Sequence, residues 1–220
     1  LLLHTAGFSY NFLADPVGKE YDRLCLFSSD DTTLESEIKI LSKAPLLFQP
    51  KASWRYSVSM DVLARIIEIV LGDSLQNVLT KKIFEPLYMK DTAFTVPIKN
   101  HERVMTSYEF DPVKMNLSEL ISDPQKIGNF GYPADVLSYA RGGHGLFSSL
   151  KDYSIFAKML HSGKSDDGNQ IIGKDILKLI STNFLDKKYF PIEIAAIGLV
   201  KDENYVNGLE AYGWGLGCRT

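Results

Sequence analysis

The sequence predicts a mainly helical domain with little β-sheet. Apolar residues recur at the three- and four-residue spacing of an amphipathic helix in 59–72, 73–86 and 149–163. By contrast, only 195–201 and 212–219 favour strands, and the second of these stretches is rich in glycine. Helices and loops are therefore expected to make up most of the structure.

The first two expected helices form a short hairpin. One begins near Ser59 and ends at Gly72, and its apolar stripe, which we expect to be buried, consists of Val62, Leu63, Ile66, Ile67 and Val70. The next begins at Asp73, which with Gln76 resembles a capping box, and Pro86 ends it.

Two further helices are expected in the second half of the chain. The third starts near Ser149, carries Asp152 as an acidic residue of its first turn, and stops at Gly163. The fourth covers residues 175–182. Between residues 92 and 145 the periodicity is weak and prolines interrupt the chain, which predicts a long irregular stretch of the kind that often carries function.

Length and composition limit the classes of protein that fit. With 220 residues, 45% apolar and 23% charged, the chain can bury a core as one domain or as two small ones. A formal charge of −3 provides no field that attracts phosphate, so nucleic acid is not an expected partner. No apolar run reaches transmembrane length. The two cysteines, Cys25 and Cys218, leave open both two free thiols and one long-range bridge.

The N-terminal residues suggest a fragment. The chain opens Leu1–Leu2–Leu3–His4 without an initiator methionine, and these residues lack the basic flank and apolar length of a signal peptide. The compartment in which the protein works therefore remains open.

Most catalytic and metal-binding signatures are absent from the sequence. It contains no Gly-x-Ser-x-Gly elbow, His-Glu-x-x-His pair, Cys-x-x-Cys or Walker loop. The four histidines, His4, His101, His144 and His161, stand singly, so we interpret them as structural or exposed and expect no metal site.

Two Ser-x-x-Lys strings occur, at Ser36–Lys39 and Ser148–Lys151. On a helix this spacing places an amine one turn from a hydroxyl, where the amine can accept the hydroxyl proton. Both residue types are common, however. We therefore interpret Ser148 as a capping residue and Ser36 as part of a solvated surface.

Five ordered strings resemble one enzyme family. They are Leu2–Tyr10, Trp54–Ser57, Asp61–Glu68, Ile83–Thr92 and Gly142–Ser148. Together they resemble the serine hydrolases related to class C β-lactamases, a group that includes D-alanyl-D-alanine carboxypeptidases and β-lactamase-like carboxylesterases. The glycine-aromatic string Tyr212–Gly217 also resembles a strand of that family. The resemblance implies an α/β (α+β) fold of the β-lactamase/transpeptidase type, of which this chain is mainly the helical lobe.

The resemblance also implies that two catalytic segments lie outside the chain. In the family, a Ser-x-x-Lys helix precedes the Leu-x-His-Thr segment, and a last active-site strand follows the glycine-aromatic strand. Neither Ser36 nor Ser148 stands at the place of the nucleophile. Residues 1–220 are therefore expected to be the central part of a single domain, without measurable hydrolysis on their own.

The family motif assigns a catalytic role to Tyr56. In the family a tyrosine at this place projects its phenol towards the serine and lysine and assists proton transfer. The alternative is that Tyr56 is an amphipathic core residue. By the same resemblance Tyr10 and Trp54 line the substrate pocket, although plain core packing fits them equally well. We interpret Gly142 and Gly143 as structural glycines.

Position 58 distinguishes the members of the family. Val58 stands where β-lactamases and carboxypeptidases carry an asparagine that binds the substrate's amide, and valine cannot make that hydrogen bond. The expected activity is thus a cofactor-free carboxylesterase that forms an acyl-enzyme with a small-molecule ester or amide. The alternatives are a β-lactamase or D-alanyl-D-alanine carboxypeptidase, and a non-catalytic scaffold with the same fold.

Overall fold

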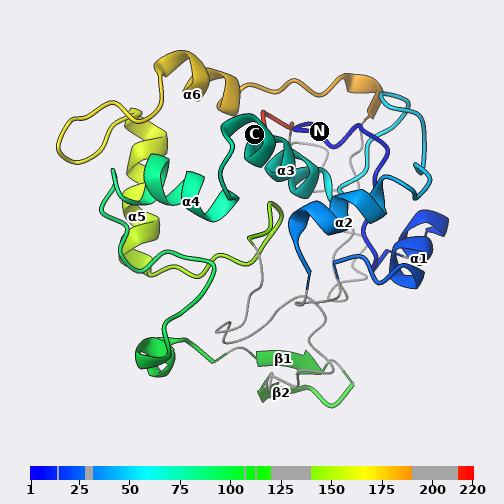
Figure 1. The fold of residues 1–220 in the computed structure, drawn as a ribbon, viewed down its shortest axis with the longest axis horizontal. Coiled ribbons are helices and arrows are strands. Elements are labelled where there is room, and N and C mark those ends of the chain that lie inside the picture. The colour runs from blue at the N-terminus through cyan, green and yellow to red at the C-terminus, as the bar shows by residue number, and fades with distance from the viewer. Residues whose placement is uncertain (14, 28–31, 107, 112, 120–139, 190–212) are drawn as a thin grey trace.

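The computed structural model describes residues 1–13, 15–27, 32–106, 108–111, 113–119, 140–189 and 213–220. Helices dominate this part of the chain, as the sequence predicts. Figure 1 shows α3 in the middle of the molecule, with α1 and α2 on one side and α4, α5 and α6 on the other. A small hairpin of β1 and β2 extends away from the helices.

Helix α1 (Pro16–Arg23) and helix α2 (Leu34–Leu41) were not predicted from periodicity. Each has only eight residues, and each depends on a capping side chain. Asp15 accepts a hydrogen bond from the Gly18 amide at the start of α1, and Thr33 accepts one from the Ser36 amide at the start of α2. These side chains satisfy backbone donors that the first helical turn leaves free.

Helix α3 (Ser59–Leu71) confirms the first expected helix, and Gly72 ends it in the left-handed conformation. The expected burial of its apolar stripe is only partly correct. Ala64 is buried, but the second half of the helix exposes Ile66 (43%), Ile69 (65%), Val70 (74%) and Leu71 (47%). Within the described part of the chain, no segment covers this face.

The second expected helix is shorter and starts one residue later than predicted. Ser74, rather than Asp73, caps α4 (Leu75–Leu79) by accepting from the Asn77 amide, and one π-helical turn, Thr80–Phe84, continues it. The Asp73 carboxylate instead accepts from the Lys81 ammonium at 2.7 Å. The hydroxyl of Ser74 reaches the free amide, whereas Asp73 lies outside the helix.

The long stretch between residues 92 and 145 contains structure that the sequence analysis missed. A 3-10 turn, Ile98–Arg103, precedes the antiparallel strands β1 (Tyr108–Asp111) and β2 (Asn116–Glu119), in which Tyr108 pairs with Glu119. The Asp111 side chain stabilises the connecting turn by accepting from the amides of Val113 and Lys114. Four-residue strands are too short to produce a clear alternating pattern.

The two expected strands have different outcomes. Residues 195–201 lie outside the described residues. The described part of 212–219 is a tight turn rather than a strand: Trp214 and Arg219 form an isolated bridge, and Gly213 and Thr220 exchange backbone hydrogen bonds. Glycines allow the chain to reverse within this short segment.

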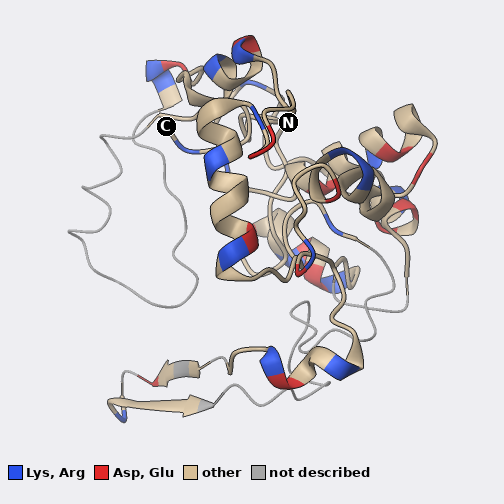
Figure 2. Ribbon diagram, turned by 90° about the vertical axis from the view of Figure 1, so that its left-hand side faces the viewer, with Lys and Arg blue, Asp and Glu red and all other residues tan. Residues whose placement is uncertain are grey.

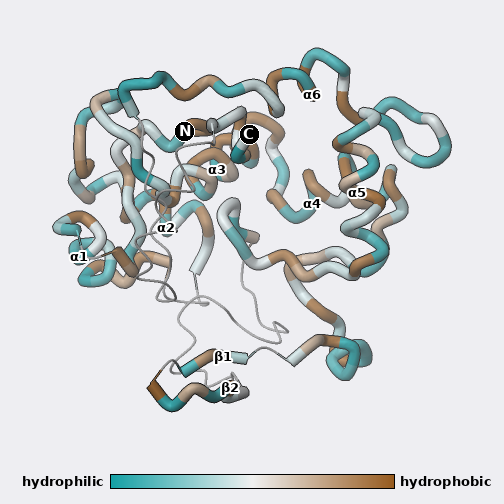
Figure 3. Tube along the Cα trace, turned by 180° about the vertical axis from the view of Figure 1, so that it is seen from behind, coloured by the Kyte–Doolittle hydropathy of each residue, from teal (hydrophilic) through white to brown (hydrophobic). Residues whose placement is uncertain are grey.

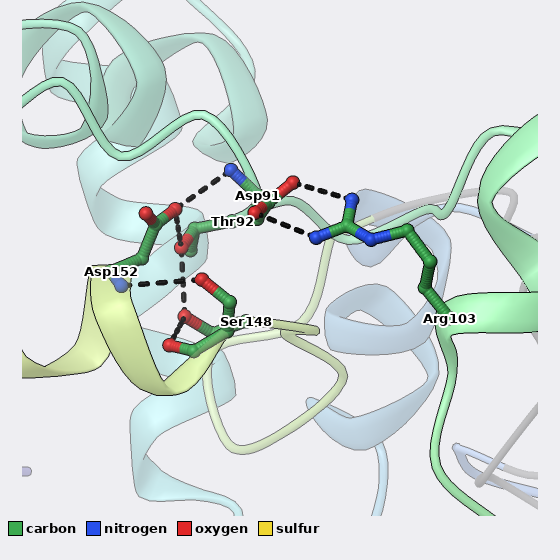
Figure 4. A network of polar contacts seen from close by, with 6 residues as sticks. Asp91, Thr92, Arg103, Ser148 and Asp152 are labelled. Atoms are coloured by element: carbon green, nitrogen blue, oxygen red, sulfur yellow. Dashed lines mark hydrogen bonds and ion pairs between the residues drawn. The ribbon is translucent and has the colours of Figure 1, made fainter.

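Helix α5 (Leu150–Ser162) and helix α6 (Lys174–Ser181) confirm the remaining expectations. Ser149 caps α5 and Gly163 ends it in the left-handed conformation. A polar network joins the start of α5 to the preceding chain (Figure 4): the Asp152 carboxylate accepts from the Asp91 amide and the Thr92 hydroxyl, at 2.7 and 2.9 Å. A 3-10 turn, Lys187–Tyr189, follows α6.

Among the described residues, four clusters of buried apolar side chains hold these elements together. The first joins α1 to α2 and includes Tyr21 and Val58, and the third packs Leu3, near the N-terminus, against Trp54 and Trp214. The hydrophilic loop between α5 and α6 lies at the edge of the molecule (Figure 3).

The surface carries both signs of charge. Figure 2 shows basic and acidic residues side by side on the helices of the described part of the chain. Cys25 and Cys218 are free thiols, which settles the alternative that the sequence left open. No helix among the described residues has the length and apolar character needed to cross a membrane.

Candidate active site

The candidate site lies where two segments distant in the sequence run side by side. The Arg55 amide donates to the His4 carbonyl at 3.0 Å, and the Val58 amide donates to the Ser9 carbonyl at 3.2 Å. These two backbone bonds bring residues 4–10 next to residues 54–58. As a result, Tyr10 and Tyr56 are neighbours, with ring centroids 5.6 Å apart.

A carboxylate at the start of α1 fixes this alignment. Asp15 Oδ2 accepts from the Ser9 hydroxyl at 2.6 Å and from the Arg55 guanidinium at 2.7 Å. Burial alone would raise the pKa of Asp15, but the hydrogen bonds from Ser9, Gly18 and Arg55 outweigh it and lower the pKa. Asp15 thus remains charged and joins the cap of α1 to both segments.

His4 lies beneath Tyr56 and is fully buried, with 1% of its surface exposed. Its Nδ1 accepts from the Ser57 amide at 3.2 Å and lies 3.3 Å from the Ser57 hydroxyl. Burial lowers the pKa of His4 to about 4, so the ring is neutral at pH 7. The histidine is structural, as predicted, and it positions the backbone that carries Tyr56.

Aromatic rings enclose His4 and Tyr56. The His4 ring lies 4.6 Å from Tyr56 and 5.2 Å from Trp214, and Trp54 contacts Trp214 at 5.5 Å in an edge-to-face arrangement. The Trp214 indole donates to the Leu2 carbonyl at 3.0 Å. The C-terminal turn therefore forms one wall of the site.

Tyr10 connects this aromatic cluster to a buried acid. Its ring stacks on Phe12 at 4.7 Å and lies 5.6 Å from the Tyr56 ring. Burial raises the pKa of Tyr10 far above its usual value, and the neighbouring Tyr56 and Asp61 raise it further. Tyr10 consequently keeps its proton throughout the physiological range.

Asp61 is the buried acid in question. It lies in the first turn of α3, where Oδ1 accepts from the Gly142 and Gly143 amides at 3.1 and 3.3 Å. Burial raises the pKa of Asp61 to about 6, against the opposing effect of these bonds and of Arg141. The sequence analysis did not assign Asp61 to the site, and it did not connect Asp61 with the structural glycines Gly142 and Gly143, which lie 81 and 82 residues away.

The structure brings together the three residues that the family motif singles out. Tyr10 and Tyr56 are half-buried neighbours, and Trp54 is buried in the cluster against which Tyr56 packs. Val58 is 1% exposed and belongs to the first apolar cluster, which includes Tyr21 and against which Tyr10 also packs.

The two Ser-x-x-Lys strings lie outside this site, as predicted. Ser36 and Lys39 are exposed on α2, and Ser148 is exposed before α5, where it contacts the Thr92 hydroxyl at 2.8 Å. Ser149, not Ser148, supplies the helix cap.

The family model for beta-lactamase matches residues 1–215. The chain belongs to the beta-lactamase family. The observed helix-rich architecture with few strands is consistent with the helical lobe of the β-lactamase/transpeptidase-like fold.

The proteins that resemble this beta-lactamase family chain include two esterases and one hydrolase of known structure. The esterase EstB of Burkholderia gladioli is 31% identical over 164 residues, which are 69% of this chain and 41% of EstB. The lovastatin esterase of Penicillium rubens is 30% identical over 173 residues, or 76% of this chain and 39% of the relative.

The solved structure of EstCE1, a hydrolase with promiscuous acyltransferase activity, has the same fold. It superposes with a TM-score of 0.73 at 23% identity, covering 99% of this chain and 54% of EstCE1. The chain thus spans less than half the length of the curated relatives and about half of EstCE1.

Proposed function

We propose that the chain is the central part of a serine hydrolase that acts through an acyl-enzyme, and more specifically of a carboxylesterase. The observation that carries this proposal is the half-buried Tyr56, whose ring packs beside the rings of His4, Tyr10 and Trp214. The enzyme class is supported by the beta-lactamase family and its esterase relatives.

The exposed face of α3 supports the proposal that the domain is larger than this chain. Ile66, Ile69 and Val70 share that face at helical spacing, and Leu71 is exposed at the end of the helix. A contiguous apolar patch of this kind marks a surface that another element covers. The remaining half of a domain as long as the relatives would supply that element, together with the nucleophilic serine and its lysine.

The proposed reaction divides into two acyl transfers. The serine oxygen attacks the ester carbonyl carbon while its proton passes to the lysine and Tyr56, and the alcohol leaves with a proton returned from the same groups. Water then attacks the acyl-enzyme carbonyl, gives up its proton by the reverse route, and releases the acid. Tyr56 holds and moves a proton at its phenolic oxygen in both halves of the reaction.

The preference for esters over β-lactams is supported by Val58. Its side chain is buried in the core and carries no hydrogen-bonding group, so position 58 offers no amide to a penicillin-like side chain. A β-lactamase or D-alanyl-D-alanine carboxypeptidase is the alternative within the family, and a non-catalytic scaffold is the alternative outside it.

The test uses the full-length protein encoded by the gene. Purified protein is incubated with p-nitrophenyl butyrate and, separately, with a chromogenic cephalosporin. We expect ester hydrolysis that Tyr56→Phe lowers about 10²- to 10⁴-fold, the usual contribution of a positioned proton-transfer group. Tyr153→Phe is the matched control, because Tyr153 is exposed on α5 and should leave the rate unchanged.

Each other outcome selects an alternative. Faster turnover of the cephalosporin, or a stable penicillin adduct, would identify the β-lactamase or carboxypeptidase activity. No turnover of either substrate by a folded protein would favour the scaffold. Equal rates for Tyr56→Phe and the wild type would remove Tyr56 from the mechanism.

A further inference from the structure

Asp61 is a buried carboxylate in the first turn of α3, and it accepts hydrogen bonds from the amides of a distant segment. It is 1% exposed, and it occupies the third position of α3. Burying a carboxylate is costly unless several groups compensate for its lost hydration. At this site the compensation comes from the amides of Gly142 and Gly143, on a segment distant in the sequence.

Asp152 provides a direct comparison within the same chain. It also occupies the third position of its helix, α5, is 3% exposed, and accepts from the backbone amide of Asp91. Its second partner is the Thr92 hydroxyl, which in turn contacts Ser148 (Figure 4). This network joins two segments of the fold.

Asp61 differs from Asp152 because it also lies against the candidate site. A Cβ atom added at Gly143 would lie 3.0 Å from Asp61 Oδ2 and 3.3 Å from the Tyr10 hydroxyl oxygen. The Asp61 carboxylate and the Tyr10 phenol therefore lie on either side of the same small space. This space stays free of a side chain because residue 143 is a glycine. Tyr10 in turn packs against Tyr56, with ring centroids 5.6 Å apart.

We propose that Asp61 is a positioning residue that acts on Tyr56 through Tyr10. Its carboxylate holds the Gly142–Gly143 backbone against α3, this backbone lies beside the Tyr10 hydroxyl, and the Tyr10 ring packs against Tyr56 and so orients its phenol. The inference rests on the proposed function, in which the Tyr56 oxygen transfers protons.

Burial above all, and then the neighbouring Tyr56 and Asp61, raise the pKa of Tyr10, so Tyr10 keeps its proton. Tyr10 therefore serves as a packing partner, and Tyr56 is the phenol to which the proposed function gives the proton transfer.

The experiment places Asp61→Asn in two backgrounds of the full-length protein, wild type and Tyr56→Phe. In the wild type we expect kcat for p-nitrophenyl butyrate to fall about 10- to 100-fold, the usual cost of a misplaced catalytic group, with KM within about twofold. In the Tyr56→Phe background the same substitution should change kcat less than about twofold, because the group that it positions is already absent.

Asp152→Asn is the matched control, since it removes the same charge from the same helical position. It should leave kcat within about twofold in both backgrounds when activity is normalised to folded protein. An equal loss from Asp61→Asn with and without the Tyr56 hydroxyl would overturn the proposal. An unchanged kcat in Asp61→Asn would do so as well.

A second measurement does not depend on catalysis. In protein labelled with ¹³C at tyrosine Cζ, Asp61→Asn should shift the Tyr10 and Tyr56 resonances and leave Tyr153 in place, whereas Asp152→Asn should leave Tyr10 and Tyr56 in place. If the wild type hydrolyses nothing, the proposed function fails, but these chemical shifts still test whether Asp61 acts on Tyr56. A Tyr56 resonance at the same position in Asp61→Asn and in the wild type would refute the positioning role of Asp61.

Discussion

The buried acid at the start of α3 should make stability depend on pH in an unusual direction. The pKa of Asp61 in the folded protein is raised to about 6 by burial, whereas an aspartate in an unfolded chain has a pKa of about 3.9. Between these values the folded state binds a proton that the unfolded state does not. Acidification through this window therefore stabilises the fold, and the ionised form above pH 6 destabilises it.

The difference of about two pKa units corresponds to about 3 kcal/mol over the whole window, and to about 2 kcal/mol between pH 7 and pH 4. Other carboxylates titrate in the same range, so the measurement is made against Asp61→Asn. We expect the free energy of unfolding of the wild type, relative to this variant, to rise by about 2 kcal/mol as the pH falls from 7 to 4.

Urea unfolding of the full-length protein, followed by tryptophan fluorescence at several pH values, measures this difference. Asp15→Asn supplies a comparison of opposite sign, because the pKa of Asp15 is lowered by its hydrogen bonds. Its stabilisation is present above the unfolded pKa and is lost as the pH falls through the folded one. The reasoning would be refuted if the free energy of unfolding of the wild type, relative to Asp61→Asn, stayed constant with pH or fell on acidification.

Three further substitutions test the close packing, the apolar core and the helix capping described above. Gly142→Ala should destabilise the fold by about 1 to 3 kcal/mol, because its Cβ would collide with the Met60 carbonyl oxygen. The control is Gly173→Ala, whose Cβ would enter open space and should leave the midpoint of thermal unfolding unchanged. Val58→Asn should cost about 1 to 3 kcal/mol by burying an amide in the apolar cluster, and labelled penicillin should still fail to acylate the folded variant. Ser149→Ala should cost about 1 kcal/mol through loss of the α5 cap, measured by urea unfolding.

The helices that could be predicted from the sequence are those whose signals are local. Helices α3 and α5 combine apolar periodicity with a terminal glycine, and the structure places Gly72 and Gly163 in the left-handed conformation. Helix α1 escaped prediction because a polar eight-residue segment shows little apolar stripe. Its stability comes from the Asp15 cap and from contacts with a segment forty residues later.

The candidate site shows the same division between local and distant signals. Tyr56 and Tyr10 were identified by family motifs, which record residue types in order and contain no distances. His4 and Asp61 were not assigned to the site, because a single histidine or a first-turn aspartate is ordinary in a sequence. Their burial arises from partners 53 and 81 residues away, which no local pattern encodes.

The glycines illustrate how a local pattern acquires its physical meaning from the fold. Gly142 and Gly143 were interpreted as structural glycines, and Gly142 allows a close backbone approach to the Met60 carbonyl. The close approach also has an electrostatic consequence: it brings two amides within hydrogen-bond distance of the Asp61 carboxylate. A side chain at position 142 would force the segments apart and leave that buried charge without its donors. The glycine pair and the aspartate therefore depend on each other, and substitutions at the two places should be strongly non-additive.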